Sequence, residues 1–457
     1  MTTLLAFVPA LFVLVIGWRR GPEPAFLNAY LPALLLLPDY YYWPGSGKPS
    51  FVSAAAVAMV AVWIVKGRAR WQPSATDALV LALVVAGAAS EWTNAGQKEG
   101  QNLFLDWVMA LLLPYVIGKG LVEPNGLSGA TARRMALLLF GVAALSLYEF
   151  RFGLNPYRLA LDRFFPGQGL GWIVSLRWGF GRTAGPFGHA ILAGMMMVVG
   201  YRLARYADWR GLFPPLPRPL RFLRMRTGVL VALGLVVGAL MTMARGPWLG
   251  GLLAGGFAAL GRTRRKWLAF GTALALLVAI GIPAIAAFRA YVMVGRAGAS
   301  SDTQETAAYR FELLQNYLGY VDERPLLGWG RNTWPKVPGQ PSIDNYYLLL
   351  MLMHGYLALA LLLAPLFWVG GRLFRRGMTE PFALPPGSSL AFTLLGAMAS
   401  MYVSIATVFL GLSTRPLLFL LIGWAEGHLL RTAPAVEGEA AVTAPEPPPF
   451  RFARVLS

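Results

Sequence analysis

Cysteine is absent from this chain of 457 residues, and histidine occurs only three times. Without cysteine the chain can form no disulfide, no thiolate nucleophile and no cysteine metal site. His189, His354 and His428 lie far apart in the sequence and lack the paired spacing of zinc-binding motifs such as HExxH. We therefore predict a protein that works without a transition metal and without another cofactor.

Charged residues are also scarce, because they make up 13% of the chain whereas hydrophobic residues make up 56%. This composition is typical of a polytopic membrane protein. Basic residues outnumber acidic ones, 40 to 21, but many of them fall in short loops between apolar segments. In such loops they set the membrane topology and meet lipid headgroups. We therefore expect membrane lipids as partners and no nucleic acid.

Apolar segments long enough to cross a hydrocarbon core recur about thirteen times before residue 430. The sequence predicts an all-α fold, a polytopic transmembrane bundle of about 12–14 spans, in residues 1–430. A disordered cytoplasmic tail rich in Pro, Ala and Glu is expected over residues 431–457. The first apolar segment lacks the cleavage site of a secretory signal, so we expect it to be a retained helix.

The distribution of charge among the loops assigns the two sides of the membrane. Basic clusters such as Lys66–Arg70 and Arg202–Arg226 fall in alternate loops, which the positive-inside rule places in the cytoplasm. Two long loops, at about 151–188 and 288–344, then face outward. The second contains Thr306–Val321, where apolar residues repeat at helical spacing, and we expect an amphipathic helix on the membrane surface.

Several arginines lie on the outward side, where basic residues do not normally collect. They are Arg182, Arg245, Arg310, Arg331 and Arg415. A guanidinium group presents a fork of donors that matches phosphate oxygens. An anion held at the outer membrane face therefore explains these residues, and a lipid diphosphate is the expected candidate.

Two short motifs carry the first two arginines. Arg182 lies in the glycine-dense stretch Gly179–His189, directly before a predicted helix. Its glycines permit close backbone approach and its amides can bind an anion, although such glycines also occur in purely structural turns. Arg245 lies at the tip of the tight turn Met243–Trp248, where it either reaches lipid headgroups or faces a cavity.

The second long loop supplies Arg310, Arg331 and, at its end, Asp344. Arg310 either contacts the ligand or pairs with Glu305 or Glu312 on a solvated face. Asp344 stands at the mouth of the next span, where it either acts as a general base toward a hydroxyl group or caps the helix.

His189 and Glu149 are further candidates on the outward side. A histidine at a helix start is commonly a hydrogen-bonded structural residue. Glu149 lies at the end of a span, where it either pairs with an arginine or orients a substrate.

The order of these motifs resembles the O-antigen ligase/polymerase superfamily of bacterial glycan assembly. The resemblance covers about Glu149–Ala360 and rests on RTAGPFGHAILAG, ARGPWLG, AAYRFELL, RPLLGWG and DNYYLLLMLMHGYLAL. In the ligases, a histidine followed by Asn, Ser or Gln, nine residues and glycine marks the periplasmic catalytic loop. Here Asp344 stands in place of that histidine, followed by Asn345, nine residues and Gly355. The chain is therefore more similar to the Wzy-type exopolysaccharide or O-antigen polymerases.

This resemblance implies a hexosyltransferase-type enzyme of the bacterial inner membrane, with its active site facing the periplasm. It implies that Arg182 and Arg245 hold the diphosphate of an undecaprenyl-linked glycan donor, and that Asp344 activates a lipid-linked acceptor. The implied substrate contacts are Arg310, Arg331, His189, Glu149, Asn345 and Tyr346. The reaction is expected to be inverting and independent of metal, and a chain-length regulator and a flippase are the expected protein partners.

Two other functions stay open. A ligase would share the donor chemistry and deliver the glycan to a lipid A core acceptor. A transporter of an anionic lipid or solute would carry its polar groups and broken helices near the bilayer midplane.

Overall fold

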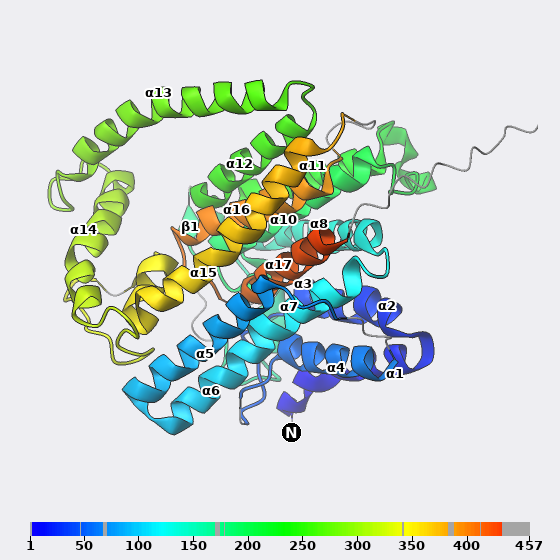
Figure 1. Ribbon diagram of the computed structural model, residues 1–457, viewed down its shortest axis with the longest axis horizontal. Coiled ribbons are helices and arrows are strands. Elements are labelled where there is room, and N and C mark those ends of the chain that lie inside the picture. The colour runs from blue at the N-terminus through cyan, green and yellow to red at the C-terminus, as the bar shows by residue number, and fades with distance from the viewer. Residues whose placement is uncertain are drawn as a thin grey trace, which may run out of the picture.

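The computed structural model describes residues 2–45, 47–66, 71–169, 174–177, 179–340, 342–382, 388–411 and 413–431. Helices make up almost all of its regular structure, and within these ranges the strands are confined to one short antiparallel pair (Figure 1). The predicted all-α class is therefore confirmed. Apart from Arg431, the tail expected over 431–457 lies outside the described residues.

The first part of the chain forms helices and short π or 3-10 turns, labelled as in Figure 1. They are η1 (Thr2–Phe7), α1 (Val8–Arg20), α2 (Pro22–Ala25), η2 (Phe26–Tyr30), α3 (Leu31–Leu36), α4 (Phe51–Lys66), α5 (Ala75–Ala95), α6 (Gln97–Trp107), η3 (Val108–Leu112), α7 (Leu113–Ile117), η4 (Gly118–Val122), α8 (Ser128–Phe152) and α9 (Pro156–Leu161).

The second part opens with the strand pair and continues with the longer helices. Its elements are β1 (Leu176–Arg177), β2 (Phe180–Gly181), η5 (Gly185–Phe187), α10 (Ala190–Trp209), η6 (Arg218–Leu223), α11 (Thr227–Met241), α12 (Arg245–Gly261), α13 (Lys266–Val292), α14 (Asp302–Glu323), α15 (Tyr346–Thr379), α16 (Leu390–Ile405) and α17 (Thr414–Leu430).

Several helices have the length and composition needed to cross a membrane. Among the described residues there are six, at Thr2–Arg20, Ala75–Ala95, Gln97–Val122, Ser128–Phe152, Lys266–Val292 and Tyr346–Thr379. The apolar helices α4, α11 and α16 are shorter. The chain is thus a multi-pass membrane protein, whereas the total of about thirteen spans stays a prediction.

Helices α10, α16 and α17 form the centre of the bundle, and most of their residues are buried (Figure 1). Small residues let neighbouring backbones approach closely, as they do between membrane helices in general. A Cβ on Gly250 of α12 would lie 2.7 Å from the Ser400 carbonyl oxygen, and one on Gly423 would lie 2.0 Å from that of Tyr115. These glycines therefore fix how α12 meets α16 and how α17 meets α7.

Helix α13 stands apart from this bundle and arches along its edge (Figure 1). Its only buried residues are its first and last, Lys266 and Val292. A helix that is apolar on every side is stable where hydrocarbon surrounds it. We therefore assign lipid as the surroundings of α13, which joins α12 to α14.

Helix α14 confirms the amphipathic helix predicted at Thr306–Val321, but its apolar face meets protein. Leu313, Tyr317 and Val321 are buried against Leu348 and Leu352 at the start of α15. The expected position on the membrane surface is thus corrected, because the periodic apolar stripe packs on the next helix of the same chain. This contact fixes α14 relative to the segment that carries Asp344.

Helix α15 is broken at Gly355, whose φ is +76°. The segment from Pro325 to Gly330 enters the break: Trp329 N donates to Leu352 O at 2.8 Å and Tyr356 N donates to Pro325 O at 2.6 Å. A Cβ on Gly355 would lie 2.2 Å from the Leu326 carbonyl oxygen, so only glycine fits. The freed backbone groups thus find protein partners, and they do not form an open ion site of the transporter type.

Candidate functional site

The glycine-dense loop, Gly179–His189, is hydrogen-bonded to Glu149. This carboxylate is fully buried at the end of α8, and its Oε2 accepts hydrogen bonds from the amides of Ala184 at 3.1 Å and Gly185 at 2.8 Å. Its Oε1 accepts a hydrogen bond from Asn155 Nδ2 at 3.0 Å. Glu149 therefore shapes the loop, and the two amides face its carboxylate instead of a ligand.

The same loop carries Arg182 onto the turn that precedes α12. Arg182 Nε donates to Thr242 O at 3.2 Å, and its backbone amide donates to Ser175 O at 2.9 Å. Arg177, on β1, donates from NH1 to Met243 O at 3.0 Å. Both guanidinium groups are thus anchored to carbonyls just before Arg245, the first residue of α12. The structure therefore joins the two outward motifs that the sequence analysis treated separately.

Helix α14 places Arg310 near Arg182 and Arg177. Burial, followed by the charges of Arg177 and Arg310, lowers the pKa of Arg182, so these three guanidinium groups lie within electrostatic range of one another. Arg310 Nε is buried without a hydrogen-bond partner among the described residues. Arg245 NH2 lies 3.5 Å from Thr303 Oγ1 at the start of the same helix.

No carboxylate neutralises these four arginines within the described parts of the chain. The two acids considered as partners of Arg310 instead engage Arg296: Glu305 Oε1 lies 3.8 Å from its NH2, and Glu312 Oε1 accepts its backbone amide at 3.2 Å. We call Arg177, Arg182, Arg245 and Arg310 the arginine cluster. Like charges gathered in this way are costly unless an anion joins them.

Asp344 and His189 lie next to this cluster. Burial and Arg182 lower the pKa of the His189 imidazole to about 4, and the Asp344 carboxylate opposes the shift. His189 caps α10, and its Nδ1 accepts a hydrogen bond from Ile191 N at 3.1 Å. At neutral pH the ring is therefore uncharged and carries its proton on Nε2, so it can serve as a donor but not as a base.

Asn345, and not Asp344, caps the helix that follows. Asn345 Oδ1 accepts hydrogen bonds from Tyr347 N at 3.0 Å and Leu348 N at 3.3 Å. Asp344 is half-buried, and its Oδ1 accepts a hydrogen bond from Ser342 Oγ at 3.1 Å. Asp344 therefore does not cap α15, which was the structural role considered for it. Its carboxylate is not occupied by the helix.

The structure does not bring Arg331 or Tyr346 into the arginine cluster. Arg331 lies against α5 and α6, where it forms salt bridges with the buried Glu91 at 3.5 Å and with Glu99 at 3.4 Å. Tyr346 lies on another side of α15, within electrostatic range of Arg415, which forms a 3.0 Å salt bridge with Asp106. Two of the outward arginines thus already have anions, supplied by the protein itself.

Two residues of this site, Arg177 and Tyr309, were not predicted from the sequence. Arg177 precedes Arg182 by five residues in the same outward loop, and this nearness in the sequence was the available signal. In the structure the two lie near each other, because β1, which carries Arg177, pairs with β2, which ends directly before Arg182. Tyr309 directly precedes Arg310, and its hydroxyl donates to Ser342 O at 2.6 Å. Tyr309 therefore ties α14 to the segment that carries Asp344, a long-range contact that no local pattern reveals.

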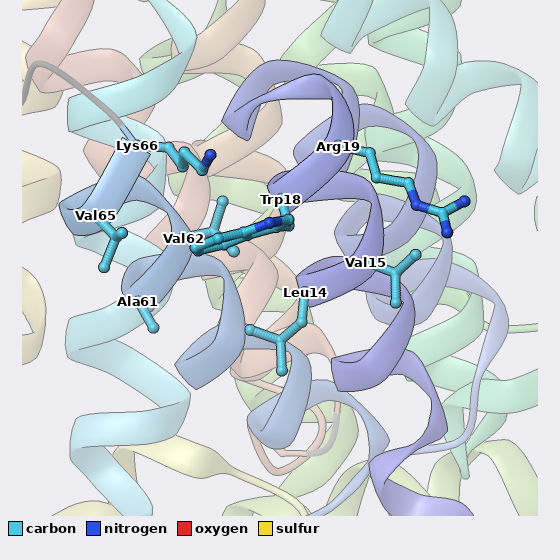
Figure 2. A pocket seen from close by; sticks show the side chains of 8 residues that line it. All are labelled: Leu14, Val15, Trp18, Arg19, Ala61, Val62, Val65 and Lys66. Carbon is cyan, nitrogen blue, oxygen red and sulfur yellow. The ribbon is translucent and has the colours of Figure 1, made fainter.

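A second feature, an apolar groove, lies elsewhere on the molecule, between α1 and α4. Figure 2 shows the Trp18 ring lying between the two helices. Lys66 Nζ lies 4.2 Å from the centre of that ring. None of the residues that line this groove belongs to the arginine cluster.

One protein family matches this chain: residues 229–363 fit the family described as O-antigen ligase. The matched part, which is less than half of the chain, includes Arg245, Arg310 and Asp344 but not Arg182. No curated protein matches the chain. The family match supports the O-antigen ligase/polymerase superfamily and a ligase- or polymerase-type role in membrane glycan processing, as the resemblance predicted.

Proposed function

From the premise that this chain belongs with the O-antigen ligase/polymerase superfamily, we propose that it is a polysaccharide polymerase of the bacterial inner membrane. In this proposal the growing glycan, linked to undecaprenyl diphosphate, is transferred to an incoming lipid-linked repeat unit at the periplasmic face. The reaction is metal-independent and inverts the anomeric configuration.

The arginine cluster carries this proposal. Arg182 is anchored to Thr242, Arg177 to Met243, and Arg310 reaches the same place from α14. Four guanidinium groups that have no carboxylate partner in the described ranges would form a preorganised site for a diphosphate. When the glycosidic bond breaks, negative charge accumulates on the departing diphosphate, and fixed donors stabilise that charge without reorganising.

Asp344 supplies the base. The acceptor hydroxyl oxygen attacks the anomeric carbon from the side opposite the diphosphate, and its proton passes to the Asp344 carboxylate. The bond between the anomeric carbon and the diphosphate oxygen breaks, and the electron pair leaves with the lipid diphosphate. A positioned base of this kind typically contributes about 10²- to 10⁴-fold to the rate. His189 lies within electrostatic range of both Arg182 and Asp344, and in this proposal it is an uncharged contact of the substrate.

Ligation is the second candidate, because the matching family is described as O-antigen ligase. Asp344 in the position of the ligase histidine favours the polymerase. The two reactions share the donor and differ in the acceptor, so products distinguish them.

The decisive experiment is incubation of the purified protein with a defined lipid-linked repeat unit, with and without a lipid A core acceptor. A ladder of products supports the polymerase, and a single shifted band on the core acceptor supports the ligase. Absence of any transfer refutes both. The assay is repeated in excess EDTA, where continued transfer is expected and strict dependence on Mg²⁺ refutes the metal-independent mechanism.

Asp344→Asn tests the base in the same assay. We expect product formation to fall by about 10²-fold or more while the amount of folded protein is unchanged. Asp322→Asn is a matched control, since Asp322 accepts a hydrogen bond from Tyr356 elsewhere on the outward side. Normal product length in Asp344→Asn removes this residue as the base.

A further inference from the structure

The apolar groove between α1 and α4 has no part in the proposed reaction. Its volume is about 390 Å³, within the range of about 300–1,000 Å³ that is typical of small-molecule sites. Its apolar walls are Leu14, Val15 and Trp18 of α1 and Ala61, Val62 and Val65 of α4 (Figure 2). The groove is therefore large enough to hold an apolar part of a ligand.

The groove lies beside the line along which α1 contacts α4. The buried residues of α1 share one face of the helix and are Pro9, Val13 and Gly17. A Cβ on Gly17 would lie 2.4 Å from Val62 Cγ1, so the two helices approach closely there. Next to this contact, Trp18 and Val65 are 68% and 69% exposed. A ligand can therefore enter the groove from the surroundings of the bundle.

Two cations stand at one end of the groove. Arg19 and Lys66 are exposed, belong to the last turns of α1 and α4, and lie on either side of Trp18 (Figure 2). Neither forms a salt bridge with a carboxylate among the described residues. The loop charges place this end on the cytoplasmic side, where the membrane leaflet carries anionic lipids.

Another lysine–tryptophan pair in the molecule shows what this one lacks. Lys119 Nζ lies 4.4 Å from the centre of the Trp71 ring, and the same nitrogen forms a 2.5 Å salt bridge with Asp77. An ammonium group over an indole ring still has donors for an anion. Lys66 Nζ lies 4.2 Å from the centre of the Trp18 ring, but no described carboxylate takes the place of Asp77. A phosphate group can fill that place.

We propose that the groove binds one anionic phospholipid from the leaflet on the predicted cytoplasmic side. An acyl chain lies between Leu14 and Val65, and the headgroup phosphate meets Lys66 and Arg19. A neutral lipid would match the apolar walls alone, and a free phosphate would match the cations alone. The inference does not depend on the proposed transferase function, because no residue of the groove belongs to the arginine cluster.

The test measures lipid binding to the full-length protein in detergent by native mass spectrometry. The probes are phosphatidylglycerol and phosphatidylcholine with identical acyl chains, and phosphatidylglycerol should bind more tightly. One basic residue near an anionic headgroup contributes about 5-fold in affinity. Arg19→Gln and Lys66→Gln should therefore each weaken phosphatidylglycerol binding by about 5-fold, and their combination by about 25-fold. Both positions are exposed, so the thermal midpoint of the lipid-free protein should change little.

Arg20→Gln is the matched control for charge. Arg20 is exposed at the same end of α1 but does not line the groove, so its loss should leave the affinity for phosphatidylglycerol unchanged. Equal losses of affinity in Arg19→Gln and Arg20→Gln would reveal a general effect of charge and overturn the proposal. Equal affinities of the wild type for the two lipids would overturn it as well.

Ala61→Phe tests the apolar part of the site. The added ring would enter the groove and should weaken the binding of phosphatidylglycerol, whereas Ile64→Phe, at an exposed position of α4 outside the groove, should not. Unchanged binding in Ala61→Phe overturns the proposal. A wild-type dimer that Ala61→Phe converts to a monomer also overturns it and assigns the groove to a second copy of the chain.

Discussion

The outward arginines divide into two groups that differ in their neighbours. Arg177, Arg182, Arg245 and Arg310 form no salt bridge with any carboxylate among the described residues, whereas Arg331 and Arg415 are paired with Glu91, Glu99 and Asp106. All of them stand on the same predicted side of the membrane. In our proposal the first group binds an anion, whereas the charges of the second group are balanced by carboxylates of the protein. The predicted side of the membrane therefore does not by itself show which arginines could bind a ligand. The positions of the neighbouring carboxylates are needed as well.

Loss of two members of the arginine cluster should have the largest effect. Removing one preorganised donor in comparable sites lowers turnover by about 10²- to 10³-fold. We expect Arg182→Ala combined with Arg310→Ala to lower glycan transfer by more than either substitution alone. Single-turnover transfer from the lipid-linked donor measures this. We expect a thermal stability close to that of the wild type, because less repulsion among the guanidinium groups offsets the lost hydrogen bonds. Unchanged transfer in the double variant would show that the arginine cluster does not bind the donor.

Arg331→Ala should lower the stability of the protein and leave its transfer activity nearly unchanged. It leaves Glu91, which is fully buried, without its salt bridge, and breaking a buried pair costs about 3–5 kcal/mol of folding free energy. We expect a lower thermal midpoint in detergent with nearly unchanged transfer per folded molecule. Arg331→Lys should recover part of the stability. A stable Arg331→Ala protein that fails to transfer glycan would move Arg331 into the first group.

Inorganic pyrophosphate should stabilise the wild-type protein by occupying the arginine cluster. A ligand at one hundred times its Kd raises the unfolding free energy by about 2.7 kcal/mol. Arg182→Ala should lose this stabilisation, and Arg331→Lys should retain it. Thermal unfolding across a pyrophosphate series measures both. Equal stabilisation of the two variants would show that pyrophosphate binds elsewhere.

The pH dependence of Asp39→Asn should give the smallest effect. Burial raises the pKa of Asp39 from 3.8 to about 6 in the folded protein, so the fold favours the protonated acid. The wild type therefore loses stability as the pH rises through about 6, and Asp39→Asn should not. We expect the variant to be slightly more stable at pH 8 and equal to the wild type below pH 4. An unchanged difference across this range would contradict a buried, titrating Asp39.

Local patterns were sufficient for part of this site. Arg182, Arg245 and Asp344 each follow or precede an apolar segment, so their membrane side could be read from loop charge. The amphipathic period predicted α14, although not that its apolar face would meet α15. Which of the two neighbours, Asp344 or Asn345, caps α15 could not be told from the sequence, and the structure assigns the cap to Asn345.

Long-range pairing accounts for what the sequence could not show. Arg331 meets Glu91 across 240 positions of the chain, and no periodicity reports such a contact. Glu149 was a candidate for substrate binding because it ends a span, yet its carboxylate serves the amides of Ala184 and Gly185. Only the assembled bundle distinguishes an arginine that is paired with a carboxylate from one that is not.

The exposure of α13 suggests that bilayer thickness influences the proposed site. The contacts of α13 with the bundle lie near its two ends, at Phe270 against Phe374 and at Val292, and its middle turns are exposed. We expect such a helix to tilt when the surrounding hydrocarbon thins or thickens. Its outward end is joined by residues 293–301 to the start of α14, where Thr303 lies 3.5 Å from Arg245, so we expect a change of tilt to act on this contact first. The acyl-chain length of the host membrane should therefore change the affinity of the arginine cluster for the proposed anion.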